Sequence, residues 1–328
     1  MRFPRSTIIC YRSGILSSDD LTDIEKEDIR RYNTKEKWYV RRAWLESARR
    51  RAAIKGAPIR YLTLTCTRVY DIELLRRNGL IRKTTRYDSD RLAFCEQNSL
   101  RYSLIWKLLP GASDCSYTFE RLVGVGDPSM PPRLSTIFPR DVINMDLTGT
   151  PFSLESSLLL ENLDMIPKLF LIQNNSPFTL WLTLRIDESN ENPAKKRKAN
   201  MLLDENLKDQ DFKTAFLGRF GQTGNLPYED FVMTIVPKLV IRSGSKNLDV
   251  RCPKRFVYVG EGNVSKMASF IFECDQIDKL ANEQTLKKKR LVEFVSMGQE
   301  NVNAILDGDN KIREECRRMK LEYEEVSL

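Results

Sequence analysis

Apolar and polar residues alternate along the middle of the chain in patterns that predict strands separated by helices. The expected strands span residues 59–66, 91–95, 119–125, 141–146 and either 168–173 or 178–186. The expected helices between them span residues 69–78, 99–109 and 154–163, the first of which ends at Gly79, a typical residue for that place. A steady alternation of strand and helix is typical of an α/β fold, in which right-handed crossovers connect a mostly parallel sheet.

Helical patterns come before and after this alternation. The additional helices are predicted at residues 19–29, 34–55, 228–240 with an interruption at Pro237, and beyond 278. Two β-rich runs at 255–260 and 266–274 are joined by Glu261-Gly262-Asn263, a turn that is typical of an antiparallel hairpin. An antiparallel hairpin is therefore expected to close the mostly parallel sheet.

These patterns divide the chain into three parts. Residues 1–57 are expected to form a basic helical N-terminal extension, residues 58–276 an α/β domain, and residues 277–328 a C-terminal helical tail. Within the domain, the polar and charged insert at about 187–211 is expected to be a mobile loop. Its run Lys195-Lys-Arg-Lys198 has the composition of a nuclear-import or nucleic-acid-binding patch. A solvated loop is the simpler interpretation of that run.

Acidic residues follow several of the predicted strands. Asp146 ends an apolar run and precedes a small, polar turn, while Glu96 follows the second strand and Asp127 follows the third. The carboxyl ends of parallel strands meet at one edge of a sheet, where ligands bind. A carboxylate at that edge can accept two hydrogen bonds from a ribose diol. The plainer alternatives are that Asp146 caps its turn, Glu96 is simply exposed, and Asp127 begins a turn.

The composition excludes several kinds of chemistry. The 328 residues include no histidine, which removes Ser–His and Cys–His nucleophiles and His-bound zinc. The seven cysteines form no Cys-x-x-Cys pair, so we expect reduced thiols and no metal site. No apolar run approaches the roughly 20 residues of a membrane span, and the N-terminus does not resemble a secretory signal. We therefore expect a cytoplasmic protein without membrane contact.

One stretch accounts for the whole net charge of +8. Residues 30–60 contain eleven basic side chains and only two acidic ones. Arginines interleaved with aromatic residues suit phosphate contact and base stacking. The residues expected to contact RNA or DNA are Arg41, Arg42, Arg49, Arg50 and Arg51. The alternatives are a solvated helix face and a docking surface for a protein partner, which the N-terminal or the C-terminal helices could provide.

The order of these features resembles that of the class I S-adenosylmethionine-dependent methyltransferases. The resemblance spans about residues 58–276 and implies a Rossmann-like, mostly parallel sheet with a closing antiparallel hairpin. The corresponding positions are the loop Thr65-Cys66-Thr67 after the first strand, Glu96 after the second, Asp127 after the third, Asp146-Leu147 after the fourth, and the hairpin at 256–274.

The resemblance also implies a cofactor and the residues that bind it. S-adenosylmethionine would be held by Cys66, Thr67, Asp71, Glu96, Gln97, Asp127, Asp146 and Leu147. Asp146 would in addition face the methyl acceptor as the catalytic residue. Methyl transfer in such a site depends mainly on positioning, so the absence of histidine is no obstacle.

The first loop departs from the family pattern, because residues 65–71 contain no glycine. Glycine lets a backbone pass close to a ligand. In one interpretation, Thr67 and Asp71 bind the cofactor through their side chains, and the chain is a methyltransferase that acts on or with nucleic acid. In the other, the site is degenerate, and the chain is an inactive methyltransferase-fold module that binds nucleic acid or protein within a larger complex.

Overall fold

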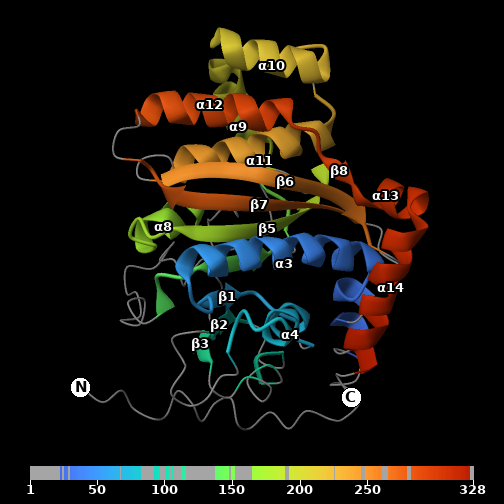
Figure 1. Cartoon of the computed structure of the whole chain (residues 1–328). Coiled ribbons are helices and arrows are strands. Elements are labelled where there is room, and N and C mark those ends of the chain that lie inside the picture. Colours follow the sequence, from blue (N-terminus) through green and yellow to red (C-terminus); the bar gives the residue numbers. More distant parts are fainter. Residues whose placement is uncertain are drawn as a thin grey trace.

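The strands form one eight-stranded sheet in a computed structural model of the chain (Figure 1). The structure describes residues 23, 26–28, 30–66, 68–82, 92–96, 101–103, 105, 109, 112–115, 137–147, 149–151, 165–188, 192–224, 226–244, 248–260, 265–278 and 282–325. The strands are β1 Tyr61–Thr63, β2 Leu92–Cys95, β3 Ser113–Cys115, β4 Val142–Asp146, β5 Phe178–Ile186, β6 Leu248–Val259, β7 Lys266–Gln276 and β8 Glu300–Asn301. The predicted α/β fold is confirmed.

The strand order is β3-β2-β1-β4-β5-β7-β6-β8. Strands β1 to β5 are parallel to one another, and β7 lies antiparallel between β5 and β6. Without β7 and β8, this is the 3-2-1-4-5-6 order of the Rossmann sheet. The chain builds outwards from β1 to β3 and then returns to β4, so the strand order reverses between β1 and β4. The closing hairpin of β6 and β7 is also as predicted.

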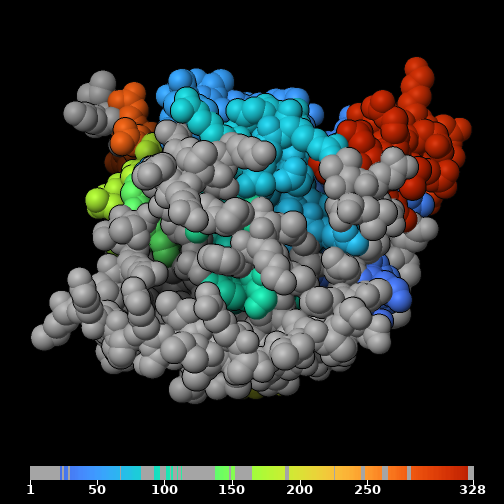
Figure 2. All heavy atoms as spheres, turned by 90° about the horizontal axis from the view of Figure 1, so that it is seen from below, coloured from blue at the N-terminus to red at the C-terminus, as the bar shows by residue number. Residues whose placement is uncertain are grey.

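Helices cover both faces of the sheet (Figure 1). The helices are α3 Lys35–Lys55, α4 Tyr70–Arg77, α8 Met165–Ile172, α9 Pro193–Asn206, α10 Gln210–Phe220, α11 Tyr228–Gly244, α12 Glu283–Ser296, α13 Val302–Gly308 and α14 Asn310–Glu325. Helices α8 to α12 contribute to the core on one face, and α3, α4, α13 and α14 to the core on the other. Seen from below, α4 lies next to both α3 and α14 (Figure 2).

The long helix α3 is part of the sheet's packing even though it precedes the first strand. Its N-cap is Thr34, whose hydroxyl accepts from the backbone N–H of Lys37, and its C-cap is Gly56 in the left-handed conformation. Trp44 stacks flat on Trp181 of β5, with ring centroids 5.0 Å apart. Apolar burial of this kind is the main source of stability, so α3 is held to the sheet by its aromatic face.

Three predicted elements are corrected by the structure. The fifth strand is at 178–186, and the alternative at 168–173 lies in α8, because a short apolar run does not distinguish strand from helix. The insert at 187–211 is not a loop but forms α9 and the start of α10, with Asn192 capping α9. Helix α11 continues through Pro237 to Gly244 instead of being interrupted.

The third strand of the sheet is Ser113–Cys115, and the predicted strand at 119–125 lies outside the described residues. β3 pairs only with β2 through its backbone, and its sequence Ser-Asp-Cys lacks the apolar alternation that predicts a strand. The predicted helix at 154–163 also lies outside the described residues. Of the predicted helices at 19–29 and 99–109, the described residues are helical except Leu109.

Gly244 marks a close approach between the end of α11 and its neighbours. A Cβ atom added there would lie 2.4 Å from Cε1 of Phe170 and 2.5 Å from Cγ2 of Val250. We expect Gly244→Ala to lower the free energy of unfolding by about 1–3 kcal/mol, because it overpacks the core. Urea unfolding measures this. Gly218→Ala on α10, where a Cβ meets nothing within 4 Å, should instead stabilise by about 0.5–1 kcal/mol.

Candidate functional site

The carboxyl ends of β1 and β4 lie side by side where the strand order reverses. In open α/β sheets this crevice is the usual ligand site. The polar side chains gathered there come from β1, from the loop after it, from the first turn of α4 and from β4. The helix α3 crosses the same edge with its first turns (Figure 1).

The carboxylate of Asp71 collects four hydrogen bonds at this edge. It accepts from the hydroxyls of Tyr61 at 2.5 Å, Thr63 at 2.7 Å and Thr65 at 3.0 Å, and from the amide of Asn144 at 3.2 Å. Asp71 is only 6% exposed. Three of these hydrogen bonds reach Oδ2 and one reaches Oδ1, so the carboxylate is held mainly by the protein's own groups. Burial and the negative charge of Asp71 raise the pKa of Tyr61.

The loop between β1 and α4 makes a left-handed turn without glycine. Val69 has φ +45° at the N-cap of α4 and donates its backbone N–H to the carbonyl of Cys66. A positive φ is a genuine outlier for a β-branched residue. The backbone at Val69 therefore has the left-handed conformation that glycine adopts easily, although Val69 carries a branched side chain.

Asp146, at the end of β4, forms a buried ion pair with Lys37 of α3. Nζ of Lys37 is 2.6 Å from Oδ2 of Asp146, and the two side chains are 4% and 10% exposed. Lys37 also donates to the hydroxyl of Tyr258 at 3.3 Å and lies 4.9 Å from the ring centre of Trp44. Burial would lower the pKa of Lys37, but the charge and hydrogen bond of Asp146 together with Tyr258 outweigh it, and the pKa is raised. Lys37 therefore remains an ammonium.

The other residues that the resemblance implied are buried, half-buried or outside the described residues. Cys66 is buried, and burial raises the pKa of its thiol to about 12. Leu147 is buried and donates its N–H to the carbonyl of Thr183. Glu96 is half-buried directly after β2. The residues outside the described part are Thr67, Gln97 and Asp127.

The five arginines of α3 divide into buried and exposed ones. Arg41 donates to the carbonyl of Tyr32 and lies over the rings of Trp38 and Tyr70. Arg51 is buried against β5 and pairs with Asp275 at 3.0 Å. The other three are partly or fully exposed. Arg42 pairs with Glu315, and Arg50 pairs with Glu273. Arg49 donates to the side chain of Asn78. Two of the five are therefore committed to the interior.

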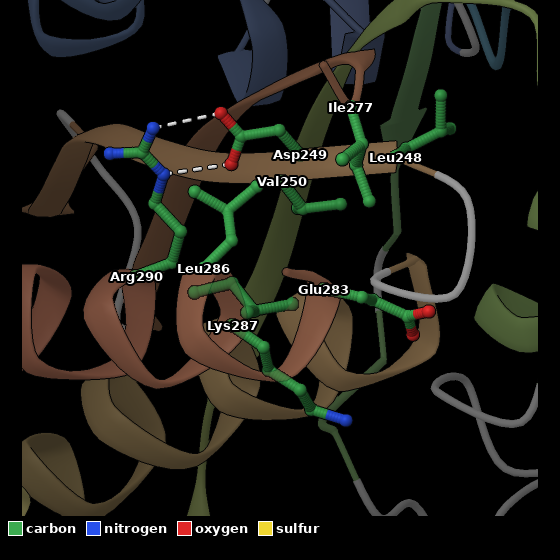
Figure 3. Close-up of a pocket in the computed structure, with 9 residues that line it drawn as sticks. Leu248, Asp249, Val250, Ile277, Glu283, Leu286, Lys287 and Arg290 are labelled. Carbon is green, nitrogen blue, oxygen red and sulfur yellow. Dashed lines mark hydrogen bonds and ion pairs between the residues drawn. The ribbon is translucent and has the colours of Figure 1, made fainter. Parts of the chain in front are cut away.

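A small pocket lies elsewhere, between β6 and α12 (Figure 3). Its polar residues do not converge on a ligand. Arg290 donates to both carboxylate oxygens of Asp249, at 2.7 and 2.8 Å, while no interaction is drawn between Glu283 and Lys287 (Figure 3). The remaining lining is aliphatic. With its one close polar pair already satisfied, this pocket is a packing feature and not a candidate site.

The sequence analysis did not identify Lys37, the residue that forms the ion pair with Asp146. A signal for it exists, because basic residues share a helical stripe with buried apolar ones. Lys37, Arg41, Trp44, Ala48 and Arg51 recur at spacings of four and three residues, and all five are buried. A basic residue in register with tryptophan and alanine on one face indicates a paired interior charge rather than a solvated one.

Neither a metal site nor a membrane span is found among the described residues. They contain no group of three or more Cys, Asp or Glu side chains placed to hold a metal ion. In the same part of the chain, every helix is too short or too polar to cross a bilayer. No known protein-family model and no curated protein sequence matches this chain.

Proposed function

We propose that this chain is a methyltransferase-fold protein that does not bind S-adenosylmethionine and serves as a non-catalytic binding module within a larger complex. One observation carries the proposal. The two carboxylates that the resemblance assigns to cofactor and acceptor are both largely shielded and held by the protein's own groups, Asp71 by four hydrogen bonds and Asp146 by its ion pair with Lys37.

The sheet supports the methyltransferase part of the proposal. The methyltransferase sheet is similar to the dinucleotide-binding Rossmann sheet but has an additional antiparallel strand between the fifth and sixth strands. In this chain β7 occupies that place. The hairpin that the sequence resemblance predicted supplies this strand. Fold does not imply activity, so the site decides between the enzyme and the binding module.

The residues of the crevice do not fit the amino-acid end of the cofactor. The ammonium of S-adenosylmethionine needs an acceptor that it can reach, and Asp71 is only 6% exposed and already accepts four hydrogen bonds, three of them at Oδ2. Releasing the carboxylate would leave Tyr61, Thr63, Thr65 and Asn144 without their partner in a buried place, which costs free energy for each group. At Asp146 a cationic ligand would have to displace Lys37, a buried counter-ion.

Isothermal titration of the purified chain with S-adenosylmethionine and S-adenosylhomocysteine tests the proposal. We expect no heat of binding for either compound, because the acceptors of the crevice are occupied. A melting curve of the same preparation controls for folding. Micromolar binding that Glu96→Ala abolishes would contradict the proposal, because it would show a working ribose site after β2.

An active S-adenosylmethionine-dependent methyltransferase is the second candidate. Its specific support is Glu96, which is half-buried at the carboxyl end of β2, next to β1 in the sheet. A carboxylate in this place suits a ribose diol. Transfer of radioactive methyl groups to RNA or DNA would identify this activity, and its loss in Glu96→Ala would tie it to the chain.

A further inference from the structure

The charges of α9 are arranged against the dipole of the helix. Its first turns carry Lys195, Lys196, Arg197 and Lys198, and its last turn carries Asp204 and Glu205. The N-terminal end of a helix favours acids and its C-terminal end favours bases. Both ends of α9 therefore carry side chains whose charge the helix dipole disfavours. Contacts outside the helix must account for this arrangement.

The acidic end is explained within the protein. Lys238 of α11 is buried and donates to the carbonyl of Leu202 on α9. Burial and the neighbouring Arg242 lower the pKa of Lys238 to about 8, while Glu205 and Asp204 act in the opposite direction. The two acids thus support a buried lysine that packs against their helix.

The basic end is explained only in part. Lys196 pairs with Glu188 and lies 5.1 Å from the ring centre of Tyr228. Arg197 and Lys198 are exposed, and no carboxylate among the described residues pairs with either. The backbone N–H groups at this end are already capped by Asn192. Two cations thus project into solvent from a place where they weaken their own helix.

The position of this basic end relates it to the edge described above. Helix α9 starts shortly after the carboxyl end of β5, which pairs with β4 up to Asp146 opposite Thr183. Lys196, which precedes the exposed pair, is tied by its ion pair to Glu188, shortly after the end of β5.

We infer that the N-terminal half of α9, with Arg197 and Lys198 as its exposed cations, is a docking surface for the phosphate backbone of double-stranded DNA. Arginine and lysine together suit phosphate oxygens. Single-stranded nucleic acid is bound largely by stacking on aromatic side chains. Helix α9 carries no aromatic residue, and the ring of the nearby Tyr228 is covered by Lys196. Charge without a stacking surface favours a duplex.

The cations of α9 differ from the arginines of α3 that were expected to contact RNA or DNA. There, Arg41 and Arg51 are buried, and Arg50 is neutralised by Glu273. The exposed pair Arg49 and Arg50 nevertheless has the same formal charge as Arg197 and Lys198. It therefore provides a matched control, because removing either pair lowers the net charge of the chain equally.

Fluorescence polarisation with a short labelled DNA duplex, titrated with salt, tests the inference. The full-length chain is compared with Arg197→Gln/Lys198→Gln and with Arg49→Gln/Arg50→Gln. Each lost phosphate contact reduces the slope of log affinity against log salt by about 0.9. We expect the α9 variant to bind roughly tenfold more weakly at low salt, with a slope reduced by about 2, and the α3 variant to bind as the unmodified chain does.

The same variants separate loss of binding from loss of structure. The α9 variant should melt at the same temperature or about 1–3 °C higher, since it removes charges that oppose the helix dipole. Failure of the unmodified chain to bind DNA would overturn the inference, as would equal weakening by both variants or weakening by the α3 variant alone. Stronger binding to single-stranded DNA, or full competition by polyglutamate, would overturn it in favour of another partner. None of these outcomes depends on S-adenosylmethionine, so they stand apart from the titration above.

Discussion

Replacing Lys37 with methionine is expected to lower the free energy of unfolding by about 3–5 kcal/mol, because it leaves a buried carboxylate without its counter-ion. The ion pair of Lys37 and Asp146 is almost fully shielded from water and is 2.6 Å long. Tyr258, which is also buried, remains as a neutral neighbour of Lys37 and cannot balance the charge. Urea unfolding followed by circular dichroism measures the loss.

Lys266→Met is the matched control, because Lys266 pairs with Glu229 in a partly exposed place. Such pairs contribute about 0–1 kcal/mol. In the double variant Lys37→Met/Asp146→Leu, most of the lost stability should return, since replacing both members of a buried pair by apolar groups is often neutral. Equal effects of Lys37→Met and Lys266→Met would show that the buried pair contributes no more than a surface pair.

The pH dependence of the Lys37 effect has a definite sign. The pKa of Lys37 is raised in the folded chain, because the charge and hydrogen bond of Asp146 together with Tyr258 outweigh the effect of burial. A group with a raised folded-state pKa contributes its full stability below its ordinary pKa and loses it as pH rises through the folded-state value. The stability difference between the unmodified chain and Lys37→Met should therefore be constant around neutrality and shrink as the solution becomes strongly alkaline.

Most of the sheet was predictable from local patterns. The apolar run that leads to Asp146 predicted β4, and the helix stop at Gly79 is confirmed, with a positive φ. These features are local, because period-two alternation and left-handed glycines act within a few residues. The hairpin of β6 and β7 was predicted for the same reason.

The failures have physical causes. β3 is short, polar and held at the sheet's edge by backbone pairing, so its side chains give no signal. Helices α9 and α10 carry many polar residues, and each buries only two side chains. These are Ala199 and Leu203 in α9, and Phe212 and Phe216 in α10. Tertiary packing, not composition, makes them helical. Charge-rich segments are therefore easily mistaken for loops.

The candidate site was predictable in place but not in content. The edge at Asp146 was identified from strand ends, whereas Asp71 was implied by the resemblance, and the structure brings the ends of β1 and β4 together. The partner of Asp146 lies 109 positions earlier in the chain, on a helix assigned to an extension. Because a long-range ion pair has no local signature, only the helical stripe that Lys37 shares with Trp44 pointed to a buried charge.

Asp71→Asn is expected to destabilise the chain by about 2–4 kcal/mol although it preserves size and shape. The carboxylate accepts hydrogen bonds from three hydroxyls and one amide in a buried place. Asparagine replaces one acceptor oxygen by an amide donor and removes the charge, so that hydrogen bonds to a charged group, each contributing about 1.5–3 kcal/mol, are weakened or lost. Thermal and urea unfolding measure the change.

The control for Asp71→Asn lies on the same helix. Glu73 pairs with Arg76 at the half-exposed surface of α4, and Glu73→Gln should cost at most about 0.5 kcal/mol. If Asp71→Asn were as stable as Glu73→Gln, the carboxylate would not be needed for structure and would be available to a ligand. That result would remove the main argument for a non-catalytic module. A large loss of stability without any change in the titration with S-adenosylmethionine would instead assign Asp71 to the architecture of the crevice.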